Sequence, residues 1–153
     1  MNIKSIFKPL VLSLAVASAA IPAAQAANPD KFIPVQGIVT GAQETVAFKG
    51  MARVNSRLAA DPDFNLPQLV FTLDLSQVPG FGASSNAQYV IGGPAIIQRR
   101  LAPSHRVEIT FPFQRVNAGV ASTQTGVASF TLDVNQDTGD IAQATANVSS
   151  PTY

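Results

Sequence analysis

The sequence contains no cysteine, no tryptophan and a single histidine, His105. Without cysteine the chain can form no disulfide framework, and it cannot be a lipoprotein anchored through an N-terminal cysteine. A zinc site needs several histidine or cysteine ligands, which one histidine with few nearby carboxylates does not supply. Stability therefore has to come from packing and backbone hydrogen bonds.

Charge is also scarce. Charged residues make up 12% of the chain, about half of the usual ~25%, and the formal net charge is +1. A strongly basic balance would indicate nucleic acid or an anionic membrane surface as a partner. Because that balance is missing, we expect no nucleic-acid partner.

The N-terminus has the pattern of a cleavable secretory signal peptide of the bacterial type. Lys4 and Lys8 precede an uncharged apolar stretch, residues 10–20, and the small-x-small motif Ala24-Gln25-Ala26 follows. The apolar run is about half of the roughly 20 residues that a membrane-spanning helix needs. We expect cleavage after Ala26, export to the periplasm or the extracellular space, and no transmembrane segment in the processed chain.

The expected mature chain, residues 27–153, has 127 residues, which fits one domain. Loss of Lys4 and Lys8 leaves eight basic and nine acidic residues, a net charge of −1. Its residues alternate between apolar and polar, and no stretch sustains a helical period. The predicted strands cover 32–40, 44–54, 69–75, 89–91, 95–101, 106–116, 126–135 and 140–148.

About seven or eight strands separated by turn signals predict an all-β fold, an antiparallel β-sandwich with a small closed β-barrel as the alternative. Residues 55–67 are expected to be a connection with one helical turn at 56–60, and residues 76–88 a long loop. Pro112 cannot donate a ladder hydrogen bond, which predicts that its strand is bulged or lies at a sheet edge.

Residues Asp133–Asp140 place oxygen-bearing side chains at alternate positions, as calcium loops do. An EF-hand loop needs glycine at its sixth position and glutamate at its twelfth, whereas Thr138 and Ala144 stand there. A polar turn with Gly139 at positive φ explains the same residues. We therefore expect a turn, with weak calcium binding as the alternative, and assign no metal site.

Five basic residues, Arg99, Arg100, His105, Arg106 and Arg115, fall within 17 positions that contain one acid, Glu108. One interpretation is an anion-binding patch built on Arg99, Arg100 and Arg106. The other, which we favour, is that acidic residues of the C-terminal hairpin neutralise these strands from a neighbouring position in the sheet.

His105 follows Pro103-Ser104 at the start of a predicted strand, where we expect an exposed histidine at a loop edge. No motif that frames a catalytic nucleophile and no cofactor-binding motif occurs. The sequence thus favours an exported, non-enzymatic binding or structural module with a protein or glycan partner, and no catalytic or cofactor-binding residue is assigned.

Three alternatives remain open. One is a small-ligand carrier with an apolar barrel cavity. Another is a pilus-like assembly subunit that pairs strands through an open sheet edge. The third is an enzyme whose site combines His105 with a carboxylate in a cleft.

Overall fold

The computed structural model describes residues 26–41, 43–118 and 123–152, and in this part of the chain it is all-β, without helix. The predicted signal peptide lies outside the described residues except for Ala26. The strands are β1 (Lys31–Thr40), β2 (Thr45–Ala60), β3 (Pro67–Asp74), β4 (Gly80–Gly82), β5 (Gln88–Ile91), β6 (Ala95–Arg100), β7 (Ser104–Arg115), β8 (Gln124–Val134) and β9 (Ile141–Ser149).

The alternating sequence pattern places one face of each long strand in the interior. In β7, every second residue from His105 to Phe113 is buried, and the residues between them are exposed. The predicted inward faces of β2, β3 and β8 are likewise buried. Because a strand turns successive side chains to opposite faces, this alternation forms a sheet with one dry side.

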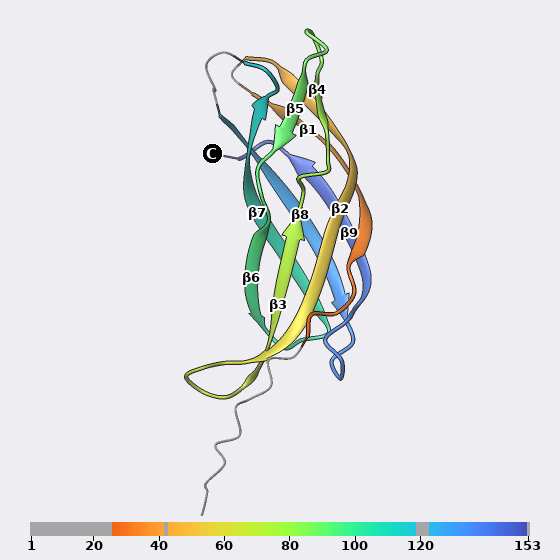
Figure 1. Cartoon of the computed structure of the whole chain (residues 1–153), viewed down its shortest axis with the longest axis vertical. Coiled ribbons are helices and arrows are strands. Elements are labelled where there is room, and N and C mark those ends of the chain that lie inside the picture. Colours follow the sequence, from red (N-terminus) through yellow and green to blue (C-terminus); the bar gives the residue numbers. More distant parts are fainter. Residues whose placement is uncertain (1–25, 42, 119–122, 153) are drawn as a thin grey trace, which may run out of the picture.

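All nine strands belong to one sheet that closes on itself. Its order is β1-β9-β8-β7-β5-β4-β2-β3-β6, and β1 also pairs with β2. Seven strands therefore form a circuit from β1 through β9, β8, β7, β5, β4 and β2 back to β1, while β3 and β6 branch from the edge of β2. The molecule is elongated, with the β4–β5 hairpin at one end and the β2–β3 loop and the β8–β9 turn at the other (Figure 1).

Two features of the predicted fold are wrong. The sheet is mixed, because β1 and β9 run parallel between Val35–Gly37 and Ala146–Val148. The strands number nine in the described residues, and the additional one is β4, within the predicted long loop.

The predicted connection after residue 54 is also wrong, since β2 continues to Ala60 and pairs with β3. Ser56 and Leu58 keep the inward parity of Val54, and Ser56 is fully buried. Antiparallel pairing with β3 therefore prevails over the local preference that favoured a helical turn.

Aromatic rings occupy the interior at the β4–β5 end. Phe48 makes edge-to-face contacts with Phe111 and Phe113 at centroid distances of 5.8 and 5.1 Å, and Tyr89 packs on Phe113 at 5.9 Å. Such contacts add about 0.5–1.5 kcal/mol each beyond the burial of apolar area.

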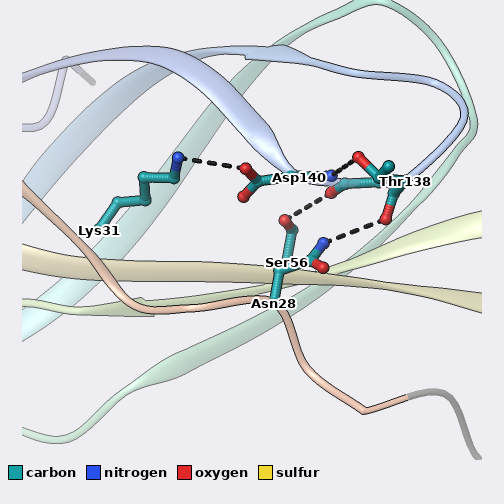
Figure 2. A network of polar contacts seen from close by, with 6 residues as sticks. Asn28, Lys31, Ser56, Thr138 and Asp140 are labelled. Carbon is teal, nitrogen blue, oxygen red and sulfur yellow. Dashed lines mark hydrogen bonds and ion pairs between the residues drawn. The ribbon is translucent and has the colours of Figure 1, made fainter.

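A polar network closes the opposite end (Figure 2). The buried Ser56 hydroxyl donates a 2.6 Å hydrogen bond to the Gly139 carbonyl, and Asn28 Nδ2 donates to the Thr138 carbonyl at 3.2 Å. Lys31 Nζ lies 3.2 Å from Asp140 Oδ2. These contacts hold the β8–β9 turn against β2 and against the segment that leads into β1.

Candidate functional site

Glu44 is the acid whose pKa is most strongly perturbed. Its carboxylate accepts hydrogen bonds from the hydroxyls of Ser85 (2.6 Å), Tyr89 (2.8 Å) and Ser84 (2.9 Å), and from the backbone N–H groups of Ser84 and Ser85. The hydrogen bond from Ser85, followed by that from Tyr89, lowers its pKa to about 2. Sequence reasoning missed this cluster, because no spacing rule connects Glu44 with residues 40 positions later.

Every one of these contacts ties the β4–β5 hairpin to the start of β2. A Cβ at Gly82 would lie 2.3–2.4 Å from the Glu44 carboxylate, so a larger residue there would push this carboxylate away from its donors. A carboxylate whose pKa five donors lower to about 2 stays ionised at neutral pH and is a poor proton carrier there. We therefore assign Glu44 a structural role.

The prediction that His105 is exposed is wrong. Its side chain points into the interior, is 8% exposed and packs edge-on against Phe71 at 5.2 Å. Burial lowers its pKa, and the charge of Arg99 lowers it further, against the opposing hydrogen bond between Nε2 and the Ala102 carbonyl.

His105 and Glu44 do not form one site. Tyr89, which contacts Glu44, pairs with Arg115, ten residues from His105 along β7. At about 3.3 Å per residue this separation is roughly 33 Å. The described residues thus do not combine these two groups into an acid–base pair.

The basic residues do not all gather at one place, because the charge of Arg99 reaches His105 near the link between β6 and β7, whereas Arg115 lies at the other end of β7. Arg99 and Arg100 lie at the end of β6, Arg106 lies near the start of β7, and Arg115 is the last residue of β7. Arg106 lies 3.5 Å from Glu108 on its own strand, and within the described chain the other three form no ion pair. As favoured, β7 lies beside β8 of the C-terminal hairpin. Within the described residues, however, no acid of that hairpin forms an ion pair with these arginines, and Asp140 pairs with Lys31.

The Asp133–Asp140 segment forms a turn, as favoured. Asn135 Oδ1 accepts hydrogen bonds from the N–H groups of Asp137 (2.9 Å) and Thr138 (3.4 Å), and Gly139 adopts φ +70°. Asp133 accepts a hydrogen bond from Ser104. The described residues contain no group of three or more histidine, cysteine or acidic residues that could hold a metal ion.

The strongest candidate site is the edge of β7 that faces away from β8. β7 pairs with β8 from Ser104 to Phe113, whereas β5 reaches the opposite edge only at Phe113–Arg115. One further backbone hydrogen bond, from Gly92 N to Pro112 O, lies next to this pairing. Within the described residues, no strand covers this edge between Ser104 and Phe111.

The contact at Pro112 also identifies the backbone groups that are free. In a strand, the N–H and C=O of one residue point to the same side, and this side alternates along the chain. Because Pro112 O points to the open edge, the N–H and C=O groups of Ser104, Arg106, Glu108 and Thr110 point there too. The prediction that this strand is bulged or lies at a sheet edge is wrong, because β7 lies between β8 and β5 and pairs with β8 in a continuous register. Pro112 is tolerated because its missing N–H faces the side that β5 leaves uncovered, and not the β8 ladder.

An open pocket of about 280 Å³ adjoins this edge. Ile109 and Phe111 of β7 line one wall, Leu73 and Leu75 line another, and the Gly92–Ala95 link between β5 and β6 forms the rim. It exists because β6 pairs with β3, and a link of three residues then leads to β7 without pairing β6 to it. The edge thus combines free backbone groups with an apolar recess.

Comparison with known proteins finds no matching family model, no matching curated protein and no matching solved structure. In the described residues, no helix is long and apolar enough to span a membrane.

Proposed function

We propose that this chain is an exported, non-enzymatic binding module that recognises protein partners by accepting a β-strand at the free edge of β7. The observation that carries the proposal is a run of backbone groups, on Ser104, Arg106, Glu108 and Thr110, that no strand of the described chain pairs, beside an apolar recess. Strand addition uses this combination: backbone hydrogen bonds supply affinity, and recesses for alternate side chains supply specificity.

Natural sheets usually protect their edges with proline, charge or a covering segment, because an exposed edge invites pairing with other chains. Here one proline stands at Pro112, and the outward side chains of Arg106 and Glu108 carry opposite charges that cancel. An edge of four free backbone positions is thus left accessible, which favours a binding role for β7 over a purely structural one.

The carrier alternative receives less support. A carrier needs an apolar cavity that encloses most of its ligand, whereas edge-to-face aromatic rings fill the interior between β2, β5 and β7. The enzymatic alternative also receives less support, because His105 is buried against Phe71, and Glu44, the acid with the strongly lowered pKa, lies far from it.

The test uses a synthetic nine-residue peptide of alternating valine and threonine, and a control peptide with proline at every second position. We expect the first peptide to shift the amide NMR signals of Arg106, Glu108 and Thr110 and to slow their hydrogen exchange. Thr110→Pro removes an edge-facing N–H without touching the β8 ladder, and should weaken binding at least tenfold. Absence of any shift on β7 at millimolar peptide would refute strand addition.

Export is tested separately by expressing the full chain in a bacterium and determining the N-terminus of the product by mass spectrometry. We expect a chain that begins at Ala27 in the periplasmic fraction or the medium. A full-length product that stays in the cytoplasm would overturn this part of the proposal.

A further inference from the structure

We propose that the strand accepted at this edge is β7 of a second copy of the same chain, in an antiparallel pairing with Val107 facing Val107. This inference rests on the proposed function, because it requires the edge to accept strands. The charges on β7 and the alternating direction of its backbone groups indicate a second copy as the partner.

The alternating direction of the backbone groups along β7 restricts the registers in which two copies of β7 can pair. Antiparallel pairing around a two-fold axis sets residues i and j opposite each other with a constant sum, and hydrogen-bonded pairs must join residues whose N–H and C=O face the partner. On β7 these are Ser104, Arg106, Glu108 and Thr110. Every acceptable register therefore pairs members of this set.

Charge selects one register among them. With Val107 on the axis, Arg106 of each copy faces Glu108 of the other, so two opposite-charge pairs form. Moving the axis by one residue places Glu108 opposite Glu108, or Arg106 opposite Arg106, and like charges directly opposite are destabilising. Both side chains are available, with 77% of Arg106 and 57% of Glu108 exposed, and their charged groups already lie on one face, 3.5 Å apart.

The ends of the free edge fit the same register. Ser104 faces Thr110 of the second copy, and each facing pair exchanges two backbone hydrogen bonds. The next pair would set Ala102 opposite Pro112, whose missing N–H ends the ladder. The three neighbouring strands β9, β8 and β7 of each copy would then form one six-stranded sheet across the axis.

The experiment is sedimentation equilibrium of the purified full-chain protein, from micromolar to millimolar concentration. We expect a reversible monomer–dimer equilibrium. Arg106→Glu places like charges opposite each other twice and should raise the dimer dissociation constant about tenfold. The swap Arg106→Glu with Glu108→Arg restores both opposite-charge pairs and should return that constant to within about threefold of the original.

Arg57→Glu is the matched control, because it makes the same charge change on an exposed residue of β2, away from this edge. Circular dichroism verifies that every variant is folded. A strictly monomeric protein at millimolar concentration overturns the dimer, and so does a dimer that is insensitive to both Arg106→Glu and Thr110→Pro. Peptide binding to β7 in a monomeric protein would leave the proposed function standing while refuting the second copy as its partner.

Discussion

The Ser56–Gly139 hydrogen bond allows a quantitative test of how the β8–β9 turn is held. Ser56→Ala removes a buried hydroxyl that donates to the Gly139 carbonyl at 2.6 Å. Removing the hydroxyl leaves the buried Gly139 carbonyl without a partner, which costs about 1–3 kcal/mol. We expect the free energy of unfolding to fall by about 2 kcal/mol.

The corresponding thermal shift follows from the size of the domain. An unfolding entropy of about 2.1 cal/mol/K per residue, for roughly 125 residues, gives about 0.26 kcal/mol/K, so the melting temperature should fall by about 8 °C. Ser104→Ala is the matched control, because its hydroxyl donates to Asp133 at 2.7 Å on an exposed surface. We expect its shift to be below about 2 °C.

Differential scanning calorimetry measures both shifts, and hydrogen exchange at the Gly139 amide reports on the turn itself. Equal shifts for Ser56→Ala and Ser104→Ala, with unchanged exchange at Gly139, would refute the view that Ser56 anchors the turn.

Four further outcomes follow from the structure. Gly139→Ala should lower the free energy of unfolding by about 2 kcal/mol or more, because φ is +70° and the added Cβ would lie 2.7 Å from Leu58. Gly93→Ala is the control, because its Cβ would meet no atom within 4 Å, and it should leave the midpoint of urea unfolding unchanged. The contribution of the Glu44 carboxylate to the stability of the β4–β5 hairpin should be complete above pH 4.5 and lost as the pH falls towards its folded pKa of about 2. Amide hydrogen exchange of the hairpin measures this, and exchange that does not change with acid pH would contradict it. Glu44→Gln should remove the pH dependence. Because burial lowers the pKa of His105 below 6.5, stability should be complete above that pH and decline below it, and His105→Gln should abolish the decline in denaturant titrations between pH 7 and 5. Calcium at 5 mM should not shift the melting temperature, and a rise of several degrees would revive the calcium hypothesis for residues 133–140.

Strand periodicity predicts most of the fold, because a half-buried strand carries apolar residues at every second position. Phe71, Phe111 and Phe130 are correctly placed in the interior on this basis alone. The pattern fails where burial is not one-sided. Asp74 alternates with the apolar Leu73 and Leu75, which would place it on the outward face, yet it is buried, and Arg53 and the Ser76 N–H satisfy its carboxylate.

The candidate site is less predictable than the fold. Pro112 indicates only that one side of its strand lacks a ladder at that position, because a residue without N–H cannot donate to one; β7 itself is an inner strand. The length of the free edge depends on where β5 stops beside β7, and no local pattern encodes that distance. The bulge between Asp133 and Val134 is equally non-local. Simple alternation from Val148 back through Ala146 and Ala144 would turn Ala142 inward, whereas Ile141 is the buried residue.

The parallel contact between β1 and β9 sets the order of events during synthesis. β1 finds this partner only in β9, more than 100 residues later in the chain, so an emerging polypeptide cannot complete its circuit until β9 has been synthesised. Contacts of such long sequence separation slow folding. A chain that crosses a membrane unfolded, as the proposed export requires, would benefit from that delay.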